Sequence, residues 1–123
     1  MKMTKILAFG LAAAIAATSG SALAAGDGEK LFKRKCGTCH TVEPGKHKVG
    51  PSLAGVVGRK AGSTDFPNYK ALKGADFTWD EEKISKWITD PKGYIGKPTA
   101  MTVKVKKEAE REAIISYLKG GDD

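Results

Sequence analysis

The residues best suited to chemistry lie in one short run near the start of the chain, Cys36-Gly37-Thr38-Cys39-His40. Two thiols separated by two residues and followed directly by a histidine form the C-x-x-C-H spacing, which is typical of covalent attachment of a c-type haem. Each thiol adds to one vinyl group of the same porphyrin, and the histidine then lies under the ring. The spacing therefore predicts thioether bonds at Cys36 and Cys39 and an axial iron ligand at His40.

Other uses of the two cysteines fit the spacing alone: a disulfide, a redox-active C-x-x-C pair or a zinc site. A thioredoxin-like pair should lie near a βαβ pattern, which the sequence lacks. A zinc site needs four ligands, and Cys36, Cys39, His40 and His47 supply them only at spacings that are compressed for a zinc finger. We favour the haem interpretation because the motif, an export signal and a small supply of large apolar residues all agree with it.

Met101 is the candidate for the second axial ligand, because the other two methionines belong to the N-terminal signal. It lies in a stretch rich in Gly and Pro, residues 91–101, from which a thioether can reach the opposite face of the ring. A His/Met pair raises the reduction potential and leaves no open iron site. The alternatives are a packing role for Met101 and ligation by His47, for which a hydrogen bond to the Gly-rich loop suits the spacing better.

The first 25 residues have the layout of a secretory signal: Lys2 and Lys5, an uncharged stretch at 6–17, and an A-x-A-like site at 22–25. Twelve apolar residues in a helix span about 18 Å, which is too short for a hydrocarbon core of about 30 Å and argues against a membrane anchor. We expect residues 1–25 to be a cleaved signal peptide. Residues 26–123 then form one soluble domain in the periplasm.

Charge limits the partners of the 123-residue chain, which has a net charge of +7, with 28% charged and 41% hydrophobic residues. This composition excludes a collagen-like fibre, a disordered tail and a multi-span membrane protein. Basic residues gather around the candidate site: Lys33, Arg34, Lys35, Lys46, Lys48, Lys92 and Lys97. They serve solubility alone, or they steer a monomer to acidic docking surfaces of redox complexes, in transient contacts that weaken with salt. Export argues against nucleic acid as a partner.

Three helices are expected to position these residues in an all-α fold. The first covers 27–36, the second opens at a capping box formed by Thr78 and Glu81 and stops at Pro91, and the third covers 107–119. Gly120 and Gly121 end the third helix. The segment 45–74 has no convincing strand. A loop of this length is uncommon in a compact domain, so it contains short helix or wraps around something that is not polypeptide.

The chain resembles the class I c-type cytochromes, of the mitochondrial cytochrome c and bacterial cytochrome c2 type, over nearly all of its length after the signal. Beyond the haem motif, the matching residues are Gly28, Phe32, Gly50-Pro51-Ser52-Leu53, Gly58-Arg59-Lys60-Ala61-Gly62, Tyr69, Trp79, Asp90-Pro91, Tyr94, Glu110-Arg111-Glu112 and Tyr117-Leu118-Lys119. The resemblance implies a small class I cytochrome c fold, in which three main helices and their loops surround one covalently bound haem c.

The resemblance also implies residue roles. Pro51 gives its carbonyl to the free ring nitrogen of His40, and Gly28 and Phe32 cross Ile114 and Tyr117. Four donors lie near the haem propionates: Arg59, Tyr69, Trp79 and Thr99. A buried carboxylate needs such charge-assisted hydrogen bonds, although Arg59 could be a solvated surface residue and Trp79 plain core.

Three departures from the family pattern fall on the Met101 side. Trp87 replaces the usual Tyr near the Met sulfur, Val103 replaces an aromatic residue and Ala100 replaces a Lys. They bear on the reduction potential and on the iron–sulfur bond rather than on the fold.

The function implied is that of an electron carrier, not an enzyme. It cycles between Fe(II) and Fe(III), linking a quinol-oxidising, bc1-type complex to a terminal oxidase or a photosynthetic reaction centre. The alternative is a small peroxidase or a gas sensor. Both need an open sixth position and acid–base groups, whereas Met101 closes the site and only His47 is to spare.

Overall fold

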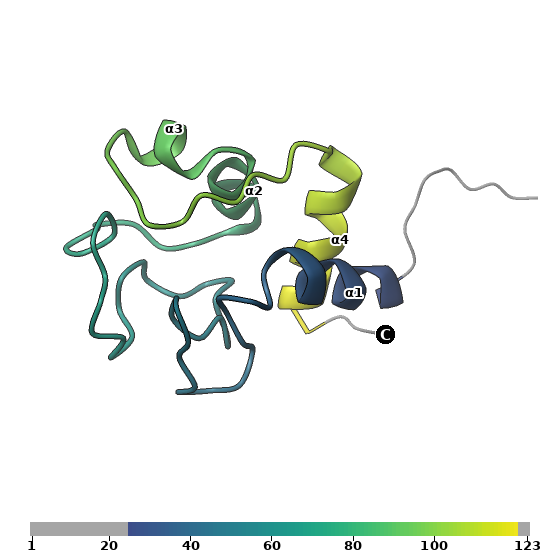
Figure 1. Cartoon of the computed structure of the whole chain (residues 1–123), viewed down its shortest axis with the longest axis horizontal. Coiled ribbons are helices and arrows are strands. Elements are labelled where there is room, and N and C mark those ends of the chain that lie inside the picture. The colour runs from purple at the N-terminus through teal and green to yellow at the C-terminus, as the bar shows by residue number, and fades with distance from the viewer. Residues whose placement is uncertain (1–24, 121–123) are drawn as a thin grey trace, which may run out of the picture.

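The computed structural model describes residues 25–120, so the expected signal peptide, apart from Ala25, lies outside the described residues. The helices follow in the order α1 (Ala25–Lys35), α2 (Glu81–Thr89), α3 (Pro91–Ile95) and α4 (Glu108–Leu118). Within this range there is no strand beyond an isolated antiparallel bridge between Lys60 and Thr78. The all-α prediction is confirmed, with α3 as one helix more than expected (Figure 1).

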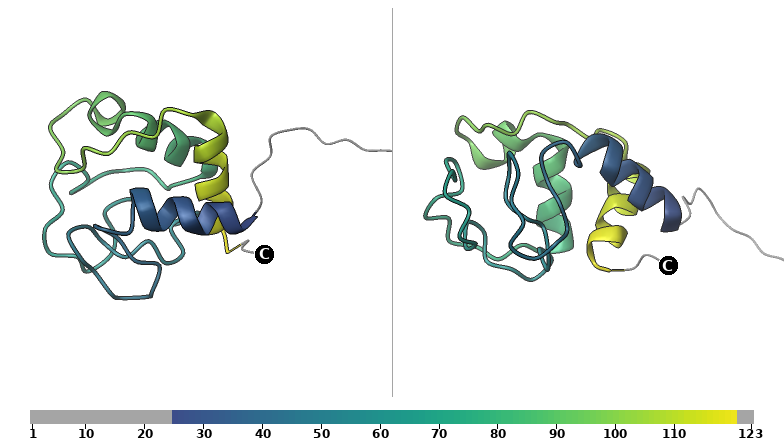
Figure 2. Two further views of the ribbon diagram at one scale, coloured as in Figure 1. Left: turned by 45° about the vertical axis from the view of Figure 1, so that its right-hand side comes forward. Right: turned by 60° about the horizontal axis from the view of Figure 1, so that its bottom comes forward.

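The first and last helices cross at one end of the molecule (Figures 1 and 2). Gly28 of α1 lies so close to the Ala113 carbonyl of α4 that a β-carbon there would overlap it. One turn later, the rings of Phe32 and Tyr117 lie 5.4 Å apart between centroids, and Ile114 is 1% exposed. The expected crossing is therefore present, and it fixes the end of α1 from which the haem motif continues.

Replacing Gly28 by Val tests this crossing. The branched side chain must displace the α4 backbone, and overpacking of this kind costs about 1–3 kcal/mol of stability. We expect thermal unfolding of the purified protein to show a loss in that range. Ser116→Ala, at an exposed position of α4, is the matched control and should stay within about 0.5 kcal/mol. Equal stability of the two variants would contradict the close approach.

Helix α2 begins later than the sequence prediction, and α3 was not predicted. Asp80, not Thr78, is the N-cap of α2, and its Oδ1 accepts the Lys83 backbone N–H at 2.7 Å. The prediction of a capping box at Thr78 was wrong, because Thr78 instead pairs with Lys60 in the isolated bridge. Pro91 lies just beyond α2, as predicted, but it also opens α3, since a proline suits the first turn of a helix.

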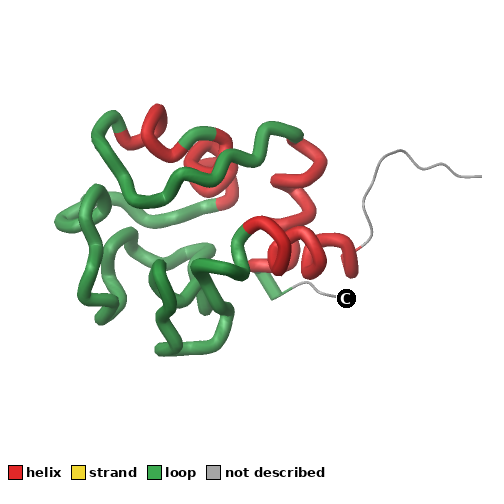
Figure 3. The backbone as a smooth tube through the Cα atoms, in the orientation of Figure 1, coloured by secondary structure: helices red, strands yellow, loops and turns green. Residues whose placement is uncertain are grey.

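Loops form the rest of the described chain and make up most of one half of the molecule (Figure 3). The segment 45–74 contains turns and bends but no helix. Short helix, the first of the two expectations, is therefore absent from this segment, and several of its residues line a cavity together with residues of α2. None of the helices in the described range is long and apolar enough to cross a membrane.

Candidate functional site

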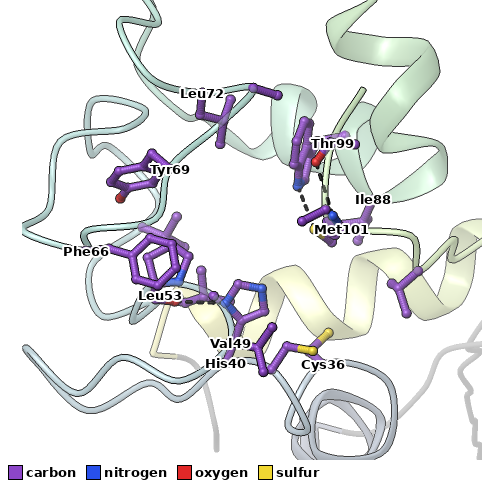
Figure 4. A pocket seen from close by; sticks show the side chains of 18 of the residues that line it. Cys36, His40, Val49, Leu53, Phe66, Tyr69, Leu72, Ile88, Thr99 and Met101 are labelled. Carbon is purple, nitrogen blue, oxygen red and sulfur yellow. Dashed lines mark hydrogen bonds between the residues drawn. The ribbon is translucent and has the colours of Figure 1, made fainter. Parts of the chain in front are cut away.

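A largely apolar cavity of about 240 Å³ lies between the loops that follow α1 and the face of α2. All nine site residues named from the sequence line it. Figure 4 shows Cys36 and His40 on one wall and Met101 and Thr99 on the opposite wall. The structure therefore gathers into one place residues that are up to 65 positions apart in the sequence.

The first wall begins where α1 ends. The backbone N–H groups of Cys39 and His40 both donate to the Cys36 carbonyl, at 3.0 and 2.9 Å, so the motif continues as a tight turn. Both thiols are free, with Cys36 buried and Cys39 half-buried. Burial raises the pKa of the Cys36 thiol to about 11. A protonated, buried thiol is a poor redox nucleophile, which disfavours the redox-pair alternative.

The imidazole of His40 is fixed from one side. Its Nδ1 donates to the Pro51 carbonyl at 2.8 Å, as the resemblance implied, and this leaves Nε2 as the nitrogen that can bind a metal. Burial is the main cause that lowers the pKa of His40, which favours the neutral ring that a metal ligand needs. Gly50 lies against the ring with no room for a β-carbon, which ties this part of the loop to His40.

The opposite wall holds the sulfur of Met101. The indole Nε1–H of Trp87, a buried residue of α2, donates to Met101 Sδ at 3.2 Å. The hydroxyl oxygen of Thr99 accepts the Met101 backbone N–H at 3.2 Å, so Thr99 shapes this loop. The sequence flagged position 87 as a departure from the family. It did not predict that the tryptophan would itself bond the sulfur.

Arg59 carries the strongest sign that a ligand belongs in the cavity. Its Nη1 donates to the carbonyls of Ser52 and Ala54, both at 2.9 Å. Its Nε is buried and has no hydrogen-bond partner among residues 25–120, and no carboxylate of those residues forms an ion pair with it. Burial lowers the pKa of Arg59, since desolvation disfavours its charge. A half-buried guanidinium with no counter-ion and one buried nitrogen without a partner fits a carboxylate supplied by a ligand.

The remaining predicted donors have mixed surroundings. The hydroxyl of Tyr69 lies 2.7 Å from that of Thr64, so a protein partner already occupies one of its hydrogen bonds. Trp79 is 5% exposed and packs edge-on against Phe77 and Trp87. Trp79 is therefore a core residue, as the packing alternative expected.

The wall residues together fit a covalently bound haem. They supply two thiols, a neutral imidazole and a thioether on facing walls, apolar sides, and a cationic group without a counter-ion. In the described range no cluster of three or more His, Cys, Asp or Glu could hold a metal ion by itself, which argues against the zinc alternative. An all-α chain with this site has the design of a class I c-type cytochrome.

Comparison with known proteins gives the same class. The cytochrome c family model matches residues 25–122. Cytochrome c2 of Rhodospirillum rubrum is 41% identical over 92% of this chain and 94% of its own length. Cytochrome c2 iso-2 of Magnetospirillum fulvum is 46% identical over 68% and 88% of the two chains. Cytochrome c of Theileria annulata is 41% identical over 75% and 81%.

The chain therefore belongs to the cytochrome c family. It is a haem-containing electron carrier that binds haem c covalently, one per chain.

Proposed function

We propose that this chain is an exported, periplasmic one-electron shuttle in which Cys36 and Cys39 hold the haem by thioethers and His40 and Met101 bind its iron. It carries electrons from a quinol-oxidising, bc1-type complex to a terminal oxidase or a photosynthetic reaction centre. The observation that carries this proposal is the placement of His40 and Met101 on facing walls of one apolar cavity.

Protein contacts hold both of the side chains that we propose as ligands. When bound, the haem supplies one-electron chemistry by cycling between Fe(II) and Fe(III). The Pro51 carbonyl fixes the orientation of His40, and the Trp87 indole fixes the Met101 sulfur. Apolar side chains around them exclude water and favour the less charged, reduced state. Ligands that stay in place on reduction suit a carrier better than an enzyme.

Arg59 is the residue we assign to a haem propionate. Arg59 lines the cavity, its buried Nε has no hydrogen-bond partner among the described residues, and its other contacts are backbone carbonyls, which carry no charge. A carboxylate beside the guanidinium would supply the counter-charge that the described residues do not provide, and this charge-assisted pairing would keep the carboxylate ionised.

Basic residues at the cavity are the basis for a docking surface. Lys35 and Lys70 line the cavity, and Lys48 is next to Val49, a lining residue that is 71% exposed. An apolar contact surrounded by lysines suits brief association of a monomer with acidic surfaces of redox complexes.

Lys70→Gln tests this surface. We expect electron transfer to a bc1-type complex in membrane vesicles to slow by about two- to threefold at low salt, with the difference fading as salt screens the charges. Lys107→Gln is the control, because Lys107 is exposed and does not line the cavity. Equal rates for the two variants at all salt concentrations would remove the basis for this docking surface.

Two experiments test the proposal as a whole. N-terminal sequencing of the protein from a periplasmic extract should start at Ala25 or Gly26, and a start at Met1 contradicts export. The absorption spectrum of the ferric protein should be that of low-spin iron with no rapid binding of cyanide. High-spin iron that binds cyanide or carbon monoxide at once would favour the alternative of a peroxidase or a gas sensor.

A further inference from the structure

One peptide group joins the two histidines of the chain. The Pro51 carbonyl accepts a hydrogen bond from His40 Nδ1 at 2.8 Å. The N–H of Ser52, which belongs to the same planar peptide unit, donates to His47 Nδ1 at 2.9 Å. The two imidazoles are therefore bonded to opposite ends of one polar, conjugated group.

The outer end of this chain of bonds is a carboxylate. His47 Nε2 lies 2.6 Å from Asp65 Oδ1. Since Nδ1 accepts from Ser52, the proton of a neutral His47 is on Nε2 and is donated to Asp65. The side chain of His47 is 16% exposed and that of Asp65 is 90% exposed. The edge of Phe66, at 5.5 Å between ring centroids, helps hold the imidazole in place.

We infer that Asp65, His47 and the Pro51–Ser52 peptide form a relay that makes His47 a positioning residue for His40 and couples a proton on His47 to the haem reduction potential. The inference rests on the proposed ligation of iron by His40. The sequence predicted a hydrogen bond between His47 and the loop backbone, and the contact with the Ser52 N–H confirms it. The inference assigns His47 a further role.

The direction of the coupling follows from polarisation along the relay. With His47 neutral, the Asp65 charge and the acceptor at Nδ1 draw the Ser52 proton outward and make the Pro51 oxygen a better acceptor. A better acceptor increases electron density on His40, which stabilises the oxidised iron. A proton on His47 Nδ1 removes the acceptor of the Ser52 N–H and adds a positive charge, and both effects favour the reduced state.

Thermodynamic linkage then determines how the reduction potential depends on pH. Because a proton on His47 favours reduction, reduction must raise the affinity of His47 for that proton by the same factor. Reduction takes one electron from the redox partner and, near the pKa of His47, a fraction of a proton from water onto Nδ1. The potential therefore falls as pH rises through that pKa and is level on either side.

Other charged groups lie on the segments around His47. Within the described chain its ring bonds only Ser52 and Asp65. The charged groups on the elements around it are Lys46, Lys48, Glu43, which pairs with Lys46, and Arg59, which donates to the Ser52 carbonyl. The hydrogen bond to His47 holds the pKa of Asp65 below its usual value, so this carboxylate stays charged while His47 titrates.

The test is a titration of the midpoint potential by spectroelectrochemistry between about pH 5 and 8, the range in which histidines titrate. NMR of both redox states gives the His47 pKa separately. For the wild type we expect proton affinity about threefold higher in the reduced state, which converts to about 28 mV at 59 mV per tenfold. The Ser52 amide signal should titrate with His47 in both states.

Two variants separate the relay from other groups. His47→Gln keeps an acceptor and a donor but cannot titrate here, so the step in potential should vanish. Asp65→Asn keeps the hydrogen-bond oxygen and removes the charge, so the step should move to lower pH. Asp76→Asn, at an exposed acid outside the relay, should leave the step unchanged.

A step that persists in His47→Gln with a native spectrum belongs to another group, such as a haem carboxylate, and overturns the inference. Equal His47 pKa values in the two redox states of the wild type overturn it too, even where His47→Gln does not fold. Failure of the proposed ligation appears instead as a non-native spectrum of the wild type.

Discussion

We expect that replacing both Cys36 and Cys39 by Ala abolishes covalent haem attachment and most of the fold. The protein without haem must leave its apolar cavity of about 240 Å³ empty, wet or collapsed. At about 24 cal/mol per Å³, an empty cavity of this size costs about 6 kcal/mol. That cost is comparable with the total stability of a small domain, about 5–15 kcal/mol. Circular dichroism should therefore show a large loss of helix in the double variant.

Single variants supply the controls for this result. Cys39→Ala retains one thioether at Cys36, so acidified acetone should not extract its haem. Thr38→Ala, at the exposed position between the cysteines, should retain the haem and the native helix content. A double variant that is free of haem and as helical as the wild type would show that the polypeptide does not need the cofactor to fold.

Met101→Leu should lower the reduction potential by an amount on the order of 0.1 V and open the iron to external ligands. Leucine conserves the apolar volume but has no sulfur, so it removes the proposed iron bond while keeping the packing. Axial ligands set haem potentials over a range of about 0.8 V, and the loss of a thioether removes an influence that favours the reduced state. Spectroelectrochemistry measures the potential, and binding of carbon monoxide to the reduced protein reports the open site.

Thr102→Ser is the matched control for the Met101 loop, since it changes the neighbouring exposed residue and leaves the sulfur in place. It should keep the potential of the wild type and exclude carbon monoxide. If Met101→Leu also keeps the potential and excludes carbon monoxide, Met101 is a packing residue and another group fills the sixth position.

Local sequence patterns were sufficient to predict much of the fold. Periodic apolar residues such as Ile84 and Trp87 placed α2, and a C-x-x-C-H motif placed the first wall of the site. Both depend on neighbours within one or two helical turns, where spacing determines geometry. The start of α2 shifted because Thr78 and Asp80 are both residues that can cap a helix, and the bridge between Thr78 and Lys60, which decides between them, is a tertiary contact.

Contacts that a loop makes with a distant part of the chain could not be predicted from the sequence. The indole of Trp87 meets the Met101 sulfur across 14 residues, and His47 meets Asp65 across 18. Neither pairing leaves a periodic signal, because loop paths rather than a helical repeat bring the partners together. The resemblance to a family supplied the Pro51–His40 bond, but it could not supply contacts at positions where this chain departs from the family, such as Trp87.

The most direct test of the account is the NMR signal of the Met101 methyl group in the reduced, diamagnetic protein. Met101 is the only methionine after residue 3, so a methionine-methyl ¹³C label gives one signal in the exported protein. If the sulfur binds iron opposite His40, the methyl group lies over the porphyrin face, and the ring current shifts its proton signal far upfield. A methyl signal at the ordinary position for methionine would contradict the proposed His40/Met101 site.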